Sequence, residues 1–171
     1  MGFGWDRCTC GECSLYIVAR GRDDVLNSLT FYCSRPEKEP NDSCMEDIAK
    51  KACRWVNTGE EFSCENYWQK TSGFQKRAYD ILKNVPRGHV TTYGEIAKCI
   101  GCGSARPVGG AMNSNRIPLV VPCHRVVGAG GALGGYAPGS KLKRTILEKE
   151  GVRFSPSGKV DASCILGFQD L

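Results

Sequence analysis

A thiol, an imidazole and a guanidinium follow one another in the segment Pro122-Cys123-His124-Arg125. Cysteine attacks as its thiolate, and a neighbouring imidazole and guanidinium both favour that anion. Of the eleven cysteines in the chain, Cys123 is therefore the one that we expect to have a lowered pKa and to act as a nucleophile. The tetrapeptide alone leaves a second interpretation open, a core cysteine beside a histidine that its neighbours satisfy.

Aliphatic, mostly β-branched residues flank this tetrapeptide in the run 117–127, I-P-L-V-V-P-C-H-R-V-V. Such a run is typical of a buried extended segment, which would mount the polar residues rigidly. Consecutive side chains of a strand point to opposite faces, so His124 cannot lie directly against Cys123 in a regular strand. We therefore expect either a water molecule between the two side chains or a break in the strand after Pro122.

Three further cysteines, Cys8, Cys10 and Cys13, form a C-x-C-x-x-C cluster. Clustered thiolates suit zinc, but a fourth ligand would have to come from a cysteine at a spacing that matches no common zinc pattern. The candidates for that ligand are Cys33, Cys44, Cys53 and Cys64. We expect unligated thiols, with no metal and no cofactor.

Length and composition bound the class of protein. A chain of 171 residues is long enough for one ordinary domain or two small ones. The 23 basic and 18 acidic residues give a net charge of +5, which permits a nucleic-acid partner without requiring one. An odd number of cysteines, no apolar run of membrane-spanning length and no charged-then-apolar leader favour a reduced intracellular compartment over a secreted disulfide scaffold.

The first 70 residues predict a small α+β unit. Residues 14–20 and 25–33 are typical of two strands, and the polar cluster 21–24 between them predicts a hairpin turn. A helix follows over 44–57, with Ser43 as its cap. We expect the span 58–70 to be an irregular linker.

The elements that must position Cys123 come from the second part of the chain. A helix is predicted from the cap Ser72 to Asn84, a short helix follows a cap at Thr91 or Thr92, and a third helix follows Ser104. The short helix, a glycine-bearing turn at 101–103 and the third helix have the plan of a helix-turn-helix. Pro107 falls in the first turn of the third helix, where its missing N–H costs little.

Gly109 and Gly110 lie inside that third helix, where the pair costs about 2 kcal/mol of helix propensity relative to alanine. Either another helix or the backbone of a ligand must therefore approach this face closely. Further on, we expect the glycine-rich loop 128–140 to wall a pocket and residues 141–150 to form a closing helix. The last twenty residues are rich in Gly, Pro and Ser and predict a tail.

Five stretches of the second part carry a resemblance: T-T-Y-G-E-I-A (91–97), A-R-P-V-G-G-A-M-N-S-N (105–115), I-P-L-V-V-P-C-H-R-V-V (117–127), L-G-G-Y (133–136) and L-K-R-T-I-L-E-K-E-G (142–151). In order and spacing they resemble the O6-alkylguanine-DNA alkyltransferase family, also called methylated-DNA–protein-cysteine methyltransferases. The resemblance implies an α+β fold with a ribonuclease-H-like α/β domain over 1–70. A mostly helical domain with the helix-turn-helix and the buried P-C-H-R segment would follow over 71–155, with a tail over 156–171.

The resemblance also assigns catalytic roles. Cys123 matches the alkyl acceptor, His124 the base that reaches it through a water, and Glu150 the carboxylate that holds the imidazole. Asn115 matches the residue that stabilises the turn around the site, and Tyr93 matches the phenol that hydrogen-bonds guanine N3 and helps to rotate the nucleotide.

Other positions would contact the DNA and the base. The residues that the resemblance places at the DNA are Arg106, Tyr93, Gly109, Gly110, Ala111 and Asn113, with Arg106 filling the gap left by the extruded base and the small face entering the minor groove. Those that would line the alkylguanine pocket are Met112, Val126, Val127, Tyr136 and Ala137. Two positions depart from the family pattern, Ala137 where many members have Ser and Pro107 where many have Ala.

The implied reaction is a single transfer of an alkyl group from O6 of a flipped guanine in double-stranded DNA to Cys123. A non-catalytic, alkyltransferase-like lesion sensor and a cysteine hydrolase are the two competing hypotheses. The sensors lack the cysteine, and a hydrolase would leave the helix-turn-helix and Arg106 unexplained. We expect a monomer that does not bind membranes, located in the nucleus of a eukaryote or otherwise in the cytoplasm.

Overall fold

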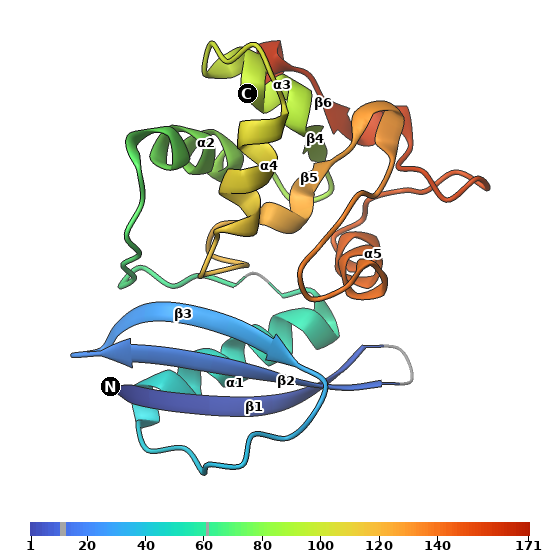
Figure 1. The fold of residues 1–171 in the computed structure, drawn as a ribbon. Helices are drawn as coiled ribbons and strands as arrows, with labels where there is room; N and C mark the ends of the chain where they lie inside the picture. Colours follow the sequence, from blue (N-terminus) through green and yellow to red (C-terminus); the bar gives the residue numbers. More distant parts are fainter. Residues whose placement is uncertain (11–12, 61) are drawn as a thin grey trace. The chain divides into compact units, whose positions relative to one another are not determined.

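The computed structural model describes residues 1–10, 13–60 and 62–171, and at Cys10 and Cys13 it describes the backbone. The chain divides into two compact units (Figure 1). Unit 1 consists of Met1–Lys70 with Arg116–Val120, and unit 2 of Thr71–Asn115 with Val121–Leu171. The segment Arg116–Val120 thus belongs to the N-terminal unit, although it is close to Cys123 in the sequence.

Unit 1 is a three-stranded antiparallel sheet with one helix on a face (Figure 1). The strands are β1 (Gly2–Cys10), β2 (Cys13–Arg22) and β3 (Val25–Tyr32), in the order β1-β2-β3. The predicted hairpin of β2 and β3 is confirmed, and Asp23 and Asp24 take the positive φ angles, 53° and 60°, that its tight turn requires. Strand β1 was missed, because its glycines and charged residues weaken the strand pattern.

Helix α1 (Ser43–Thr58) covers β1 and β2. Its cap is Asp42 and not Ser43, since the Asp42 side chain accepts a hydrogen bond from the Met45 backbone N–H at 3.1 Å. A Cβ at Gly4 would clash with the backbone of Glu46, so the helix approaches β1 more closely than any other residue would allow.

The span 58–70 is more than an irregular linker. The backbone N–H of Leu26 donates to the carbonyl of Asn66 at 2.9 Å, and the N–H of Trp68 donates to the carbonyl of Leu26 at 2.8 Å. Residues 66–68 therefore pair with the outer edge of β3.

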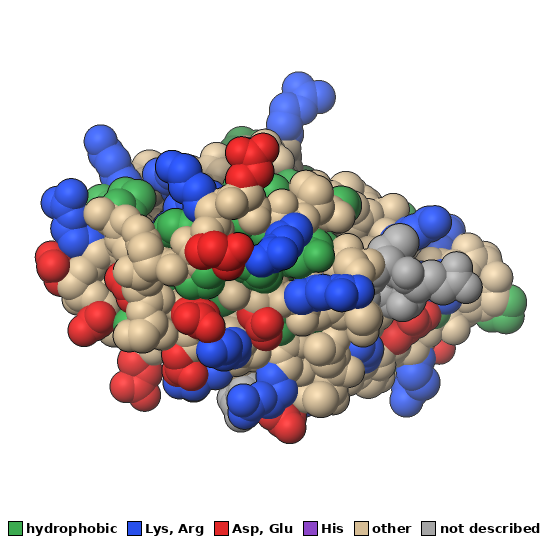
Figure 2. Space-filling view, turned by 90° about the horizontal axis from the view of Figure 1, so that it is seen from below, with side chains coloured by type: hydrophobic (Ala, Val, Ile, Leu, Met, Phe, Trp, Pro, Cys, Tyr) green, Lys and Arg blue, Asp and Glu red, His purple; other side chains and the backbone are tan. Residues whose placement is uncertain are grey.

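On the face of the molecule in Figure 2, acidic and basic side chains are interspersed, so this face does not carry a purely basic patch that would account for the net charge of +5.

Unit 2 contains the helices α2 (Gly73–Lys83), α3 (Tyr93–Cys99), α4 (Arg106–Asn113) and α5 (Ser140–Lys149). Its parallel sheet has the order β5-β4-β6, formed by β4 (Val90–Thr92), β5 (Val126–Val127) and β6 (Ile165–Leu166). The 3₁₀ turns are η1 (Cys123–Arg125), η2 (Ala129–Gly131), η3 (Ala162–Cys164) and η4 (Phe168–Asp170).

The helix caps of unit 2 agree with the sequence at two of three positions. Ser72 forms a capping box with Gln75 at the start of α2, and Thr92 caps α3 by accepting from the Glu95 N–H at 3.1 Å. Helix α4 begins one residue later than predicted, after Ala105 and without a side-chain cap. Its predicted cap, Ser104, accepts only a longer hydrogen bond of 3.3 Å from the N–H of Arg106.

Residues 156–171 do not form a tail. Val160 and Cys164 are buried in a core cluster with Val90, Val127, Leu147 and Val152, and β6 pairs in parallel with β4. The Gly, Pro and Ser residues that suggested a tail form a tight turn, in which the Ser155 N–H donates to the carbonyl of Lys159 at 2.8 Å. The composition of this segment therefore indicated the turn, but the prediction overlooked the apolar residues that follow the turn.

Candidate active site

Cys123 lies at the start of the η1 turn, immediately after Pro122. The extended strand expected over 117–122 is absent: Leu119 has a positive φ of 77° and residues 119–120 form a turn, so the strand of this run is limited to Val126–Val127. In the η1 turn His124 is free from the strict alternation of a strand. The side chains of Cys123 and His124 are both buried, and Cys123 is 8% exposed. The site is therefore a protected thiol at a turn and not on a regular strand.

The expected lowering of the Cys123 pKa is wrong for the protein without DNA. Burial raises the pKa of the Cys123 thiol, because a thiolate loses its hydration there. A hydrogen bond from Asn115 and the charge of Lys143 act in the opposite direction and lower the pKa, but burial outweighs them. The prediction failed because the tetrapeptide names the neighbours of the thiol but contains no information on how deeply the thiol is buried.

Asn115 connects the end of α4 to the turn that carries Cys123. Its side-chain amide donates to the Val121 carbonyl at 2.8 Å, and its backbone N–H donates to the carbonyl of Met112 at 3.2 Å. One amide side chain therefore holds both the thiol and the backbone that leads into it.

His124 and Glu150 are in direct contact. The distance between Nε2 of His124 and Oε1 of Glu150 is 3.1 Å. Burial lowers the pKa of His124, and Glu150 only partly opposes this, so the imidazole is neutral at neutral pH. Burial would raise the pKa of Glu150, but His124 and Arg125 outweigh it and bring that pKa to about 2. At neutral pH a neutral imidazole thus lies against an ionised carboxylate.

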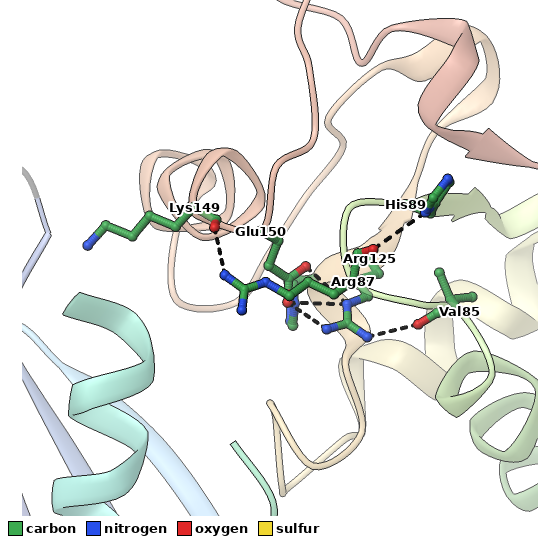
Figure 3. Close-up of polar contacts among 7 residues, drawn as sticks. Val85, Arg87, His89, Arg125, Lys149 and Glu150 are labelled. Atoms are coloured by element: carbon green, nitrogen blue, oxygen red, sulfur yellow. Dashed lines mark hydrogen bonds and ion pairs between the residues drawn. The ribbon is translucent and has the colours of Figure 1, made fainter. Parts of the chain in front are cut away.

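Arg125 does not act on the thiol in the way that the tetrapeptide suggested. Its guanidinium binds Glu150, with Nη2 to Oε1 at 2.6 Å, and also donates from Nη1 to the carbonyl of Val85 at 2.8 Å (Figure 3). Sequence reasoning missed this pair because 25 residues separate its members.

Lys143 is a second residue that sequence reasoning missed. Its ammonium is buried and donates to the carbonyls of Val126 at 2.6 Å and Leu133 at 2.7 Å, which ties β5 to the glycine-rich loop. Burial lowers the pKa of Lys143 to about 8. Its spacing could have indicated its burial, since Lys143 lies three and four residues before Ile146 and Leu147 and therefore on the same buried face of α5.

The predicted pocket residues differ in their exposure. Met112, Val126 and Val127 are buried, and Val127 packs in the core cluster described above. Ala137 is exposed. The Tyr136 hydroxyl is buried and has no hydrogen-bond partner within the described part of the chain. A buried hydroxyl without a partner is costly, which singles out Tyr136 among the residues predicted to line a pocket.

Helix α4 presents an open face. A Cβ built at Gly109 or Gly110 would meet no described atom within 4 Å, so no helix among the described residues explains the two glycines. Arg106 and Asn113 are exposed on the same helix, whereas Ala111 is buried and 3% exposed. The side chain of Ala111 therefore does not belong to the open face, contrary to the sequence-based assignment.

Comparison with known proteins assigns the chain to a family. The model "6-O-methylguanine DNA methyltransferase, DNA binding domain" matches residues 73–152. A methylated-DNA–protein-cysteine methyltransferase of Methanosarcina acetivorans is 53% identical over 142 residues, which cover 79% of this chain and 91% of that protein. The chain belongs to the methylated-DNA–protein-cysteine methyltransferase family.

Other comparisons agree with this membership. A methylated-DNA–protein-cysteine methyltransferase of Methanothermobacter thermautotrophicus is 48% identical over 79 residues, 46% of this chain and 44% of that relative. The crystal structure of Mycobacterium tuberculosis OGT in complex with DNA superimposes with a TM-score of 0.74 at 33% identity, covering 88% of this chain and 93% of that one. The mixed α/β fold of this methyltransferase family member is thus shared with a solved relative.

Within residues 1–10, 13–60 and 62–171, no group of three or more His, Cys, Asp or Glu side chains is placed to hold a metal ion. The side chains of Cys10 and Cys13 lie outside this description, and with them the C-x-C-x-x-C cluster as a whole. No helix among the described residues is both long and apolar enough to cross a membrane.

Proposed function

We propose that this protein repairs double-stranded DNA by transferring an alkyl group from O6 of guanine to Sγ of its own Cys123. The observation that carries the proposal is the contact of His124 with Glu150 beside the buried Cys123, in a member of this family. In the reaction, the bond from sulfur to the alkyl carbon forms as the bond from that carbon to O6 breaks. The product thioether has no easy leaving step, so each molecule acts once.

The proton of the thiol has to leave during this reaction. Because burial raises the pKa of Cys123, little thiolate exists before the base arrives, and a neutral His124 is suited to accept the proton, through a water. Glu150 then stabilises the imidazolium that forms, in the manner of a catalytic triad. The departing guanine takes up a proton, which leaves an unmodified base.

The pocket for the flipped base is proposed next to Tyr136. Its buried hydroxyl has no described partner, and Lys143 fixes the loop on which it lies through the Leu133 carbonyl. Tyr93 begins α3 and is half-buried, where its phenol can reach guanine N3. Base flipping costs a few kcal/mol, which contacts of this kind offset.

For the DNA we propose a helix-turn-helix formed by α3 and α4. The open face at Gly109 and Gly110 would enter the minor groove, and Arg106 would replace the extruded base in the stack. In the same proposal, unit 1 corresponds to a ribonuclease-H-like domain and residues 122–125 form the P-C-H-R active-site segment. An intracellular location and a monomeric state remain predictions.

Intact-mass spectrometry tests the proposal. After incubation with duplex DNA that contains O6-methylguanine, we expect a gain of one methyl group per protein, located on Cys123 by peptide mapping. The Cys123→Ser variant should gain no mass and should still bind DNA, because the thiol takes no part in groove contacts. Binding without transfer by the wild type would favour the lesion sensor, and catalytic turnover of an acyl substrate would favour the hydrolase.

A further inference from the structure

Arg125 holds the carboxylate of Glu150 more closely than His124 does. Its Nη2 donates to Oε1 at 2.6 Å, and its Nε lies 3.2 Å from Oε1 and 3.0 Å from Oε2. The imidazole of His124 lies 3.1 Å from Oε1. The guanidinium thus engages both carboxylate oxygens as a fork, the strongest geometry for this pair, and shares one of them with the imidazole.

The turn between α2 and β4 anchors this arrangement at two points. The Val85 carbonyl accepts from Nη1 of Arg125 at 2.8 Å. Two residues further on, Nη2 of Arg87 donates to the Lys149 carbonyl at 2.9 Å, immediately before Glu150 (Figure 3). The same turn therefore holds the partner of the carboxylate and the end of the helix from which the carboxylate projects.

We propose that Arg125 and Arg87 form a clamp that positions Glu150 for His124 during alkyl transfer. Arg125 acts on the carboxylate, and Arg87 acts on the backbone at the C-terminal end of α5. The clamp rests on the proposed function, because it serves the imidazole that accepts the thiol proton. Both arginines are positioning residues.

Arg125 also has an electrostatic effect on the imidazole. Burial lowers the pKa of His124 most; among charged groups, Glu150 raises this pKa, and Arg125 and Lys143 lower it. Arg125 therefore helps to keep His124 neutral and able to accept a proton. Arg87 binds the backbone carbonyl of Lys149, so we expect its contribution to be geometric.

Three variants separate geometry from charge: Arg125→Lys, Arg125→Gln and Arg87→Ala. Arg144→Ala is a matched control, because Arg144 lies on α5 and binds the exposed Glu148 at 2.8 Å. Two quantities are measured: the pKa of His124 by NMR in the unreacted protein, and the single-turnover rate of mass gain with saturating free O6-benzylguanine.

We expect Arg125→Gln to raise the His124 pKa, because a positive neighbour is lost. Arg125→Lys keeps the charge and loses the fork, so the pKa of His124 should stay near that of the wild type while the rate falls about tenfold. Arg87→Ala should slow transfer about threefold without changing that pKa, since one exposed hydrogen bond is removed. Arg144→Ala should change neither quantity.

The clamp is overturned if Arg125→Gln leaves the His124 pKa unchanged, or if Arg125→Lys and Arg87→Ala react as fast as the wild type. Arg87 is exposed, so its variant provides a test even if the Arg125 variants do not fold. A wild type that gains no mass would refute the proposed function. The NMR titration uses no substrate and would still decide whether Arg125 controls His124.

Discussion

Nε2 of His124 lies 3.1 Å from Oε1 of Glu150, with the two side chains 0% and 1% exposed. The two residues are 26 positions apart in the sequence. Glu150 follows directly after the last residue of α5. Helix α5 thus brings a carboxylate to an imidazole inside the protein, where water competes little for either group.

Replacing Glu150 with Gln tests this contact kinetically. The amide keeps the size of the side chain and removes the charge that stabilises the imidazolium, so alkylation of Cys123 should slow about a hundredfold. The rate with free O6-benzylguanine should be measured between pH 5 and pH 10, since a weaker base shifts its profile. A profile that coincides with that of the wild type would count against the relay.

The same residue should affect acid stability. Folding lowers the pKa of Glu150 from 4.5 to about 2, so its ionised form stabilises the native state fully above about pH 4.5, and this contribution is lost as the pH falls toward 2. The shift corresponds to about 3 kcal/mol of unfolding free energy. Urea unfolding at pH 6 and pH 3 should show a smaller loss for Glu150→Gln than for the wild type; equal losses would contradict the assignment.

Gly110→Ala separates stability from DNA repair. A Cβ at this position meets no described atom within 4 Å, so alanine should stabilise α4 by about 1 kcal/mol, measured by thermal unfolding. Transfer from duplex DNA should slow, because the added methyl group keeps the minor groove at a distance, while transfer from free base should not change. Gly73→Ala, also in open space, is the control; faster or unchanged repair by Gly110→Ala would exclude this face from the interface.

Arg106→Ala tests base flipping. Transfer from free O6-benzylguanine should remain near the wild-type rate, because no duplex has to be opened. Transfer from duplex DNA should slow sharply, since the flipped state loses the group that occupies the stack. Affinity for undamaged DNA should fall only modestly, because phosphate contacts persist. Arg77→Ala, an exposed change on α2, is the control, and equal slowing on free base and duplex would mean that Arg106 supports the pocket itself.

The N-terminal cysteines give a further prediction. If Cys8, Cys10 and Cys13 are unligated thiols, purified protein should contain no stoichiometric zinc, and a chelator should leave its Tm unchanged. Elemental analysis that finds about one equivalent of zinc would show that these thiolates form a metal site.

Local signals in the sequence determined much of the scaffold and led to the prediction of the nucleophile. The cap at Ser72 and the hairpin of β2 and β3 could be predicted because each depends on neighbouring residues. The P-C-H-R segment singled out Cys123 for the same reason, since the thiol, the imidazole and the guanidinium belong to consecutive residues.

Tertiary structure alone decided how these groups work together. It buried Cys123 deeply enough to raise its pKa, directed Arg125 to Glu150 instead of the thiol, and left the face of Gly109 and Gly110 open. It also paired β6, near the C-terminus, with β4. Burial and ion pairing depend on which distant segments meet, and a pattern of adjacent residues records the side chains that are present without recording what covers them.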